Sequence, residues 1–232
     1  ILDRDNKNKN GRHDGIIGFF NLAKDLKKYN FDKIFIFNSS LRFNLIARFS
    51  NIPEIYQYPL FNKNKQHIID TPKKFLKDKL DINVSEDPDI QISDELTLEA
   101  LNKFQIDKND FNILLGIGGS GPTKRIPSRI FLKVIDKILK IKKCKFFLAT
   151  GINNEEQILL NEILNTKYKN FCVPLDKLSI KETLPIIKCC NLSICNDSSF
   201  SHLSAALGIK TITLMADTPL IYGSYNSNMF PI

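Results

Sequence analysis

A polar stretch, Asn196-Asp197-Ser198-Ser199, separates two apolar runs, and His202 follows it. The pattern predicts that a strand ends here and that a helix begins, with Ser198 or Ser199 as its cap. A cap needs one oxygen, whereas this stretch gathers a carboxylate, hydroxyls and an imidazole within one helical turn. Because a helix N-terminus carries a partial positive charge, a dianionic phosphate would fit there. The alternative is a plain cap before a helix that packs on the core.

A glycine-rich loop, Gly116-Ile117-Gly118-Gly119-Ser120-Gly121, ends another apolar run. Glycines let backbone N–H groups point at a ligand from close by. Lys124 and Arg125 add positive charge just before a helix that opens at Pro127. These features favour an anion site, but the loop has neither the GK[ST] ending of a P-loop nor a clean GxGxxG spacing. A simple turn is the alternative.

Two carboxylates, Glu155 and Glu156, follow a third apolar run and the polar stretch TGINN. In the structural explanation, Asn154 caps a helix, and each carboxylate favours the positive helix end by about 0.3–1 kcal/mol. In the functional explanation, Glu155 turns into a cleft and accepts hydrogen bonds from the hydroxyl groups of a ribose. The sequence leaves both open.

The elements that must position these three stretches form a regular series. Strands are predicted at residues 111–117, 144–149, 171–173, 192–195 and 211–215, with helices at 127–141, 155–164, 180–189 and 200–207. Such alternation predicts a mostly parallel sheet with helices on both faces. Ligands of these sheets bind outside the carboxyl ends of the strands. We therefore expect the three stretches to meet in one site.

The first half of the chain is less regular. An apolar stripe at Ile16, Phe19, Phe20, Ala23 and Leu26 predicts a helix over residues 15–29. A strand at 33–38, a helix at 41–49, a strand at 54–58, a helix capped by Thr71 that runs to residue 80, and a helix at 96–104 follow. Residues 81–94 are polar and predict a linker. We expect two domains, at residues 1–108 and 109–232.

Composition narrows the class of protein. The chain has 232 residues, is 43% hydrophobic and has a net charge of +8. No apolar run approaches the roughly 20 residues of a membrane-spanning helix, which predicts a soluble protein. The five cysteines form no CxxC pair, and with only three histidines no zinc cluster is expected, which favours reduced cytosolic thiols and no metal.

The positive charge bears on the choice of partner, and the two chain ends bear on whether the sequence is complete. The lysine-dense residues 63–79 show no pattern of interleaved aromatic side chains, so we do not expect a nucleic-acid partner. The chain does not begin with Met, and it stops without a helix-stop pattern. We expect a fragment that lacks both termini.

Several motifs together resemble glycosyltransferase family 9, the ADP-heptose:lipopolysaccharide heptosyltransferases. They are GSGPTKRIP, TGINNEE, NDSSFSHLSAALGIKTITL and TPLIYGSY, in that order and spacing, with NKNKQHIIDTPKKFLKDKL similar to the family's His-containing segment. The resemblance covers nearly the whole chain. It implies an α/β fold of the GT-B type, with two Rossmann-type domains built on parallel sheets. The N-terminal domain, on the acceptor side, would be incomplete, and the C-terminal domain would bind the nucleotide sugar but lack its last helices.

The resemblance also assigns site residues. They are Ser120, Lys124, Glu155, Leu178, Asp197, Ser198, Ser199 and His202. The first two would hold donor phosphate and sugar oxygens, the glutamate the ribose, and the leucine would pack near the adenine. The aspartate would bind hydroxyls of the transferred sugar, and the last three residues would surround the pyrophosphate. The catalytic base would lie before Ile1.

Two departures from the family pattern concern the donor sugar. Ser199 stands where the family usually has glycine, and Met215-Ala216-Asp217 replaces a Gly-Pro-Thr, although Pro219, Gly223 and Tyr225 line up. These changes leave the identity of the sugar open.

The implied function is inverting transfer of a heptose, or a related sugar, from an ADP-sugar to a lipopolysaccharide core. No cofactor is implied. The acceptor would be an anionic lipid A-core, and the protein would be cytoplasmic, with peripheral contact at the inner face of the inner membrane. Lacking its base, this chain is expected to bind the donor and turn over poorly.

Three alternatives remain at this point. A metal-dependent GT-A transferase would use Asp3-Arg4-Asp5 or Asp87-Pro88-Asp89 as its D-x-D motif. A non-catalytic module would only bind a nucleotide sugar. A GT-B transferase would use another nucleotide sugar.

Overall fold

The chain divides into two compact units in a computed structural model that describes residues 11–60, 68–84, 87–107, 109–222 and 226–232. The first unit comprises Ile1–Ser85 and the second Glu86–Ile232. The division falls earlier than the predicted boundary at 108/109 because α4 (Asp94–Lys103) packs against α7 (Ile180–Lys188). The Ile90 N–H also donates to the Ala206 carbonyl at 2.8 Å, so much of the predicted linker belongs to the second unit.

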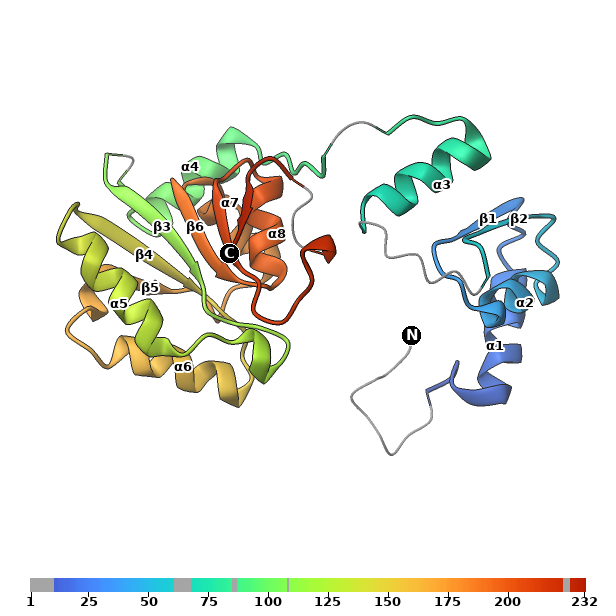
Figure 1. Ribbon diagram of the computed structural model, residues 1–232, viewed down its shortest axis with the longest axis horizontal. Coiled ribbons are helices and arrows are strands. Elements are labelled where there is room, and N and C mark those ends of the chain that lie inside the picture. The colour runs from blue at the N-terminus through green and yellow to red at the C-terminus, as the bar shows by residue number, and fades with distance from the viewer. Residues whose placement is uncertain (1–10, 61–67, 85–86, 108, 223–225) are drawn as a thin grey trace. The chain divides into compact units, whose positions relative to one another are not determined.

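The second unit is built on a six-stranded parallel sheet (Figure 1). Its strands are β3 (Phe111–Gly116), β4 (Cys144–Ala149), β5 (Cys172–Pro174), β6 (Leu192–Asn196), β7 (Thr211–Leu214) and β8 (Met229–Pro231). They lie in the order β5-β4-β3-β6-β7-β8, which is the 3-2-1-4-5-6 order of a Rossmann fold. The predicted α/β fold with a parallel sheet is confirmed, and the strand order reverses between β3 and β6.

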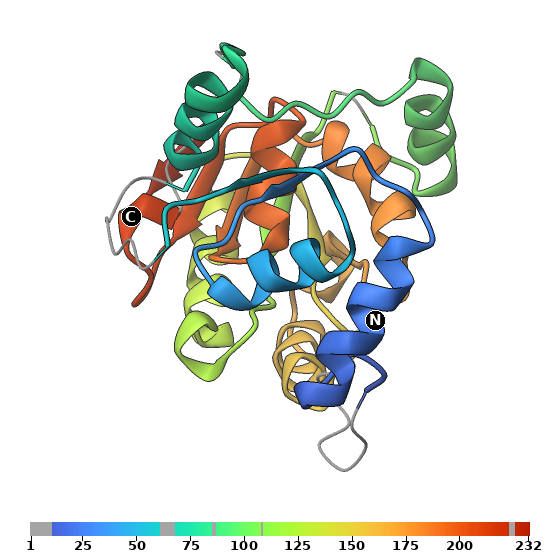
Figure 2. The same ribbon diagram turned by 90° about the vertical axis from the view of Figure 1, so that its right-hand side faces the viewer.

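Helices cover both faces of this sheet (Figures 1 and 2). On one face, α5 (Ser128–Leu139) and α6 (Asn154–Leu164) pack against Ile113 and Leu115. On the other, α4, α7 and α8 (Ser199–Ala206) pack against Leu114. Successive residues of β3 therefore pack into opposite cores, which explains why Ile113, Leu114 and Leu115 are all apolar rather than alternating with polar residues.

The two central strands approach each other closely at the end where the order reverses. Gly116 pairs with Cys195 in the register of β3 and β6. A Cβ atom on Gly116 would lie 2.6 Å from the Cys195 Sγ, so this position has no room for a side chain. Burial raises the pKa of the Cys195 thiol to about 12, which keeps it protonated and unreactive.

Several local predictions in the second unit were incomplete or wrong. The short strand β8 was not predicted, and three 3₁₀ turns occur at Pro122–Lys124, Lys169–Phe171 and Leu220–Tyr222. The α6 cap is Asn153 rather than Asn154, because the Asn153 Oδ1 accepts the Glu156 N–H at 3.0 Å. Neither Ser198 nor Ser199 makes a side-chain cap for α8, whose N-cap position is occupied by Ser198.

The first unit contains α1 (Gly15–Lys27), β1 (Lys33–Ile36), α2 (Leu41–Phe49), β2 (Glu54–Gln57) and α3 (Asp70–Leu80). The two strands pair in parallel, and a small core forms around Ile36, Ala47 and Ile52. Of the predicted α1 stripe, Ala23 is buried, but Ile16 is 81% and Phe20 53% exposed, because a two-stranded sheet covers little of the helix. Helix α3 begins at Asp70 with Ile69 at its N-cap position, so the predicted cap by Thr71 was wrong.

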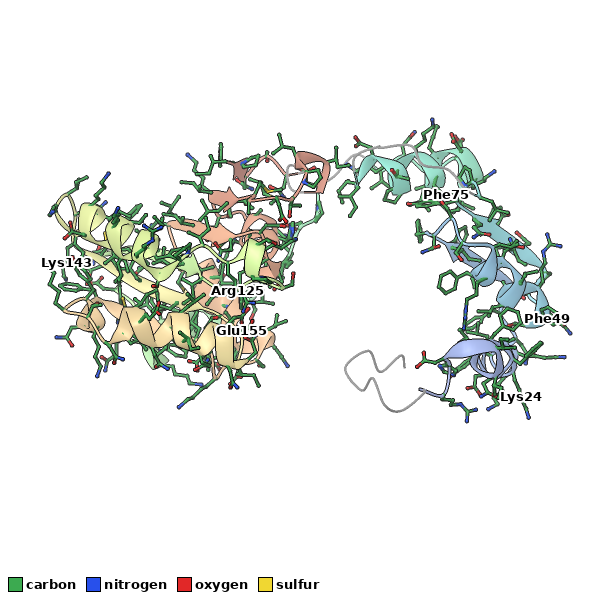
Figure 3. All side chains as sticks on the ribbon, turned by 60° about the horizontal axis from the view of Figure 1, so that its bottom comes forward. Lys24, Phe49, Phe75, Arg125, Lys143 and Glu155 are labelled. Atoms are coloured by element: carbon green, nitrogen blue, oxygen red, sulfur yellow. The ribbon has the colours of Figure 1, made fainter. Side chains whose placement is uncertain are left out.

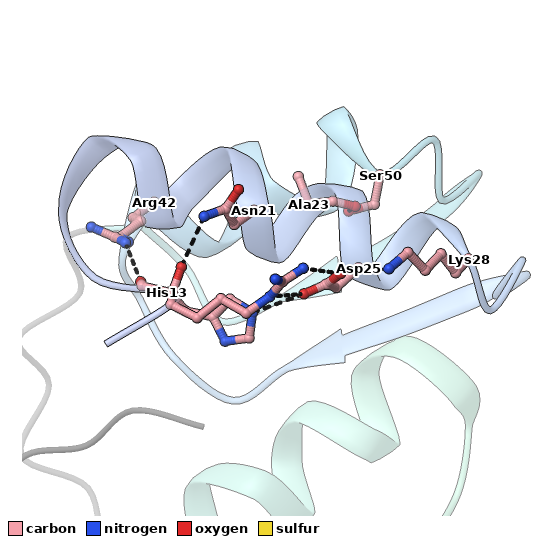
Figure 4. A network of polar contacts seen from close by, with 8 residues as sticks. His13, Asn21, Ala23, Asp25, Lys28, Arg42 and Ser50 are labelled. Carbon is pink, nitrogen blue, oxygen red and sulfur yellow. Dashed lines mark hydrogen bonds and ion pairs between the residues drawn. The ribbon is translucent and has the colours of Figure 1, made fainter. Parts of the chain in front are cut away.

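A polar network ties the segment before α1 to that helix (Figure 4). The Asp25 carboxylate accepts two hydrogen bonds from Arg12 and one from Lys28, all at 2.9 Å, and His13 Nε2 lies 3.1 Å away. These contacts, led by Arg12, hold the pKa of Asp25 far below its ordinary value. Arg42 donates to the His13 carbonyl from α2.

Candidate functional site

A cavity of about 620 Å³ opens at the carboxyl ends of the strands in the second unit. Its volume lies in the range of small-molecule sites, and it sits where the strand order reverses, which is where ligands of such sheets bind. Of the predicted site residues, those that line it are Ser120, Lys124, Leu178, Asp197, Ser198, Ser199 and His202. The structure thus brings together all the predicted residues except Glu155.

Asp197 is the charged centre of this cavity. It directly follows β6, and its N–H donates to the Leu214 carbonyl of β7 at 3.1 Å, which leaves the residue 6% exposed. Its Oδ2 accepts hydrogen bonds from Lys124 Nζ at 2.5 Å and from Thr218 Oγ1 at 2.6 Å. Burial raises the pKa of this carboxyl, but the two hydrogen bonds outweigh burial and hold the pKa below its ordinary value. The carboxylate is therefore ionised and fixed in direction.

Thr218, which donates a hydrogen bond to Asp197, was not among the predicted site residues. It lies in the loop after β7, within the stretch TPLIYGSY that carried part of the resemblance. The available signal was its place after a strand, since the loop that follows β7 opens at the same edge of the sheet as the loops after β3 and β6.

The N-terminus of α8 presents polar groups to the cavity. Ser198 occupies the N-cap position, and its Oγ is shielded from solvent without a hydrogen-bond partner among the described residues. Its carbonyl accepts the Ser201 hydroxyl at 2.8 Å. An unpaired hydroxyl next to a helix N-terminus is suited to an anionic oxygen.

His202 lies one turn into α8, with its Nε2 3.9 Å from the Asp197 Oδ1. Burial lowers the pKa of the imidazole, the Asp197 carboxylate raises it by less, and Lys124 lowers it further. The net effect is a pKa below the ordinary value, so the neutral imidazole is favoured near pH 7. A neutral ring offers one donor and one acceptor to a ligand.

The two neighbouring glutamates have different places. The Glu155 side chain is 73% exposed and forms an ion pair with Arg125. Figure 3 labels these two residues next to each other in the second unit. Glu156 is only 6% exposed and lines the cavity. Of these two glutamates, the one that lines the cavity is therefore Glu156, for which the sequence predicted no role in the site.

Glu156 also accepts a hydrogen bond from the glycine-rich loop after β3, whose N–H groups were expected to face a ligand. Its Oε1 accepts the Gly119 N–H at 2.8 Å, and its Oε2 accepts the Gly151 N–H at 2.5 Å. The Thr150 hydroxyl is 3.4 Å from the same Oε2. The glycine loop after β3 thus directs at least the Gly119 amide at a side chain of the protein.

An apolar part of the cavity lies near the ends of β4 and β5. It includes Ile152, Leu178 and Ile180. Ile152 is 79% and Ile180 56% exposed, which leaves apolar surface beside the polar groups. A flat apolar group such as a nucleobase would bury this surface.

No cluster of three His, Cys, Asp or Glu side chains that could hold a metal ion occurs among the described residues. Of the two D-x-D motifs, Asp3-Arg4-Asp5 lies outside the described residues, as does the segment around His67. Asp87 accepts the Ser227 N–H at 3.2 Å, and Asp89 accepts a hydrogen bond from Gln91. None of the helices within the described ranges has the length and apolarity of a membrane crossing.

The geometry agrees with the similarity of the chain to known proteins. Residues 19–229 match the family described as glycosyltransferase family 9 (heptosyltransferase). The chain is 32% identical to lipooligosaccharide heptosyltransferase 2 of Campylobacter jejuni over 211 residues, which cover 85% of this chain and 60% of that protein. The chain therefore spans about 60% of the length of this relative.

Two solved structures share the fold. An E. coli protein described as ADP-heptose lps heptosyltransferase II matches with a TM-score of 0.70 and 17% identity, over 92% of this chain and 72% of that one. A glycosyltransferase of family 9 from Veillonella parvula matches with a TM-score of 0.75 and 20% identity, over 98% and 70% of the two chains.

Proposed function

Because the chain belongs to glycosyltransferase family 9, we propose that it is part of an inverting transferase that moves a heptose, or a related sugar, from an ADP-sugar to a lipopolysaccharide core. One observation carries the proposal: Lys124, Asp197 and the N-terminus of α8 line a single cavity where the strand order reverses. The names of the Campylobacter jejuni relative and of the E. coli structure support a heptose donor and a lipopolysaccharide-type acceptor.

The leaving diphosphate would bind between Lys124 and the start of α8. A transferase must stabilise the negative charge that develops on this group as the glycosidic bond to the donor breaks. The ammonium group has three donors, and its side chain is 31% exposed, so it has room for a phosphate oxygen beside Asp197. Ser198, the Ser199 N–H and His202 would supply further hydrogen bonds.

The sugar and the nucleoside would take the remaining groups. Asp197, ionised and held by two donors, would accept hydrogen bonds from hydroxyls of the transferred sugar, with Ser120 beside it on the phosphate side. Leu178 would pack against the adenine. Ribose recognition by Glu155 belongs to the same proposal, and it requires this carboxylate to turn from Arg125 toward the cavity.

The acceptor would be an anionic lipid A-core bound on the side of the first unit, with the protein in the cytoplasm and in peripheral contact with the inner membrane. The net charge of +8 supports an anionic partner. In this proposal the catalytic base belongs to a part of the transferase outside this chain.

Calorimetric titration tests the donor assignment. The chain is titrated with ADP-heptose, GDP-mannose and UDP-glucose, and we expect the tightest binding for ADP-heptose. Lys124→Ala should weaken it. Equal affinity for all three nucleotide sugars, or none for any, would contradict the proposal. Tight binding without transfer by the full-length protein would instead indicate a non-catalytic nucleotide-sugar-binding module.

A further inference from the structure

Glu156 is a buried carboxylate for which the proposed chemistry has no role. It is 6% exposed, and the ion pair with Arg125 is made by the neighbouring Glu155. A buried charge is costly unless hydrogen bonds compensate it. Here the compensation comes from the backbone: the Gly119 and Gly151 N–H groups donate to its two oxygens at 2.8 and 2.5 Å. Its place in the first turn of α6 adds the favourable field of the helix N-terminus.

These donors belong to two different loops of the cavity. Gly119 follows β3, and Gly151 follows β4. Glu156 thus links α6 to both loops through a bridge of hydrogen bonds, and the backbone of each loop lies close around its carboxylate. A Cβ atom on Gly151 would lie 2.3 Å from the Glu156 Oε2, and one on Gly118 would lie 3.1 Å from its carboxylate. The absence of side chains at these positions leaves the space that the carboxylate occupies.

We propose that Glu156 is a positioning residue for the donor cavity. Its carboxylate acts as an internal anion that binds the amides of both loops and thereby fixes the cavity wall next to Ser120. The glycine loop would then shape the diphosphate site without giving its Gly119 amide to the ligand. The inference rests on the proposed function for the identity of the ligand, but the bridge itself is a property of the protein alone.

Direct recognition of the ribose is the competing role for a carboxylate here. The hydrogen bonds favour positioning, because each Glu156 oxygen already accepts a backbone amide and Oε2 also lies 3.4 Å from the Thr150 hydroxyl. A ligand that took over these oxygens would leave buried amides unpaired, which is unfavourable.

Glu156→Gln provides the test, because glutamine has one acceptor oxygen and cannot satisfy both amides. We expect hydrogen exchange to accelerate about 10- to 100-fold at whichever of the Gly119 and Gly151 amides faces the glutamine NH₂ group and so loses its acceptor. Affinities for ADP and for inorganic pyrophosphate should both fall about tenfold. Glu99→Gln is the matched control, since Glu99 is exposed on α4, and it should change none of these quantities.

Each outcome decides one part of the proposal. Unchanged exchange at both amides would overturn the bridge. Faster exchange with unchanged affinities would overturn the positioning role. Weaker ADP binding with unchanged pyrophosphate binding would assign Glu156 to the ribose and overturn positioning. Failure of the wild-type chain to bind ADP would instead overturn the proposed function, while the exchange rates would still decide whether the bridge exists.

A second variant covers the case in which Glu156→Gln does not fold. Gly151→Ala retains the carboxylate but places a methyl group where the Glu156 Oε2 now lies. We expect it to displace the carboxylate and to weaken ADP and pyrophosphate alike. Unchanged binding by this variant would contradict the positioning role independently.

Discussion

Single residues in the cavity take their chemical state from a few neighbours. Asp197 is buried, yet its pKa lies below the ordinary value because Lys124 and Thr218 hydrogen-bond to it. His202, a few ångströms away, is shifted toward its neutral form mainly by burial. An ionised carboxylate and a neutral imidazole therefore lie next to each other. The neighbours that set these two states can be tested by substitution.

Lys124→Ala tests the stabilisation of the leaving group. Removing one preorganised donor of this kind typically reduces the rate by about 10²- to 10³-fold. We expect this loss in a transfer assay with the full-length protein, with the far-ultraviolet circular dichroism spectrum unchanged. Normal transfer by the variant would show that the diphosphate binds elsewhere.

Thr218→Val tests the orientation of Asp197. The substitution keeps the shape of the side chain but removes the hydroxyl that donates to the carboxylate at 2.6 Å. A hydrogen bond to a charged group contributes about 1.5–3 kcal/mol, so donor affinity should fall at least about tenfold. Thr218→Ser retains the hydroxyl and should restore most of the affinity in the same titration. Equal affinity of both variants would argue against the role of the hydroxyl.

The lowered pKa of His202 predicts a dependence of stability on pH. The unfolded chain takes up this proton at the ordinary value of 6.5, whereas the folded protein does so only at lower pH. The stabilising contribution is therefore complete above that value and is lost as the pH falls through the folded pKa. The lowered pKa of Asp197 also makes the protein less stable as the pH falls, but only at pH values below the ordinary carboxyl pKa of 3.8.

Urea unfolding at about pH 7.5 and about pH 5.5, in the wild-type chain and in His202→Gln, tests the His202 contribution, because this window lies above the Asp197 titration. The free energy of unfolding should decrease less between these pH values in His202→Gln than in the wild-type chain. The other two histidines are present in both proteins and cancel in the comparison. An identical decrease would contradict the prediction.

At the scale of helices and strands, the sequence predicted most of the second unit because its strands are apolar on both faces. The predicted strand at 144–149 has the bounds of β4, and in the first unit the predicted helix at 41–49 has the bounds of α2. Strand β8 escaped prediction because it has three residues and ends in Pro231, both atypical of a strand. Two consecutive asparagines gave no means of choosing between them as the cap of α6.

The misplaced cap explains part of the uncertainty about the two glutamates. Successive residues of a helix point about 100° apart, so Glu155 and Glu156 leave α6 in different directions, and in the described structure Glu156 is the one that lines the cavity. Which one does so depends on the start of α6 and on the glycine amides at Gly119 and Gly151. Those contacts join separate loops, and no local pattern encodes them.

Substitution of the two asparagines tests the start of α6. Asn153→Ala removes the oxygen that accepts the Glu156 N–H, and it should lower the free energy of unfolding by about 1 kcal/mol. Asn154→Ala is the matched control and should change it little, because Asn154 lies within the helix. Denaturant unfolding of both variants gives the comparison. A larger decrease in the free energy of unfolding for Asn154→Ala than for Asn153→Ala would indicate that Asn154 is the cap, as the sequence predicted.

At the scale of the whole molecule, the two units differ in how much core they contain. The second unit holds two large clusters of buried apolar side chains, one on each face of its sheet. The described part of the first unit has a small cluster around Ile36, Ala47 and Ile52. The sequence predicted two domains but not their division, since the contacts of α4 with α7 span distant parts of the chain.

The second unit should therefore fold and bind the donor without the first. Every residue that lines the cavity lies between Gly118 and His202, and both large cores are confined to residues after 86. A protein comprising residues 86–232 should unfold cooperatively and bind ADP with an affinity within about threefold of the 232-residue chain, since the same contacts are present. Calorimetry on the two proteins measures this. If the shorter protein folds but loses ADP binding, the first unit must contribute to donor recognition, and the donor site would extend beyond the cavity described in the second unit.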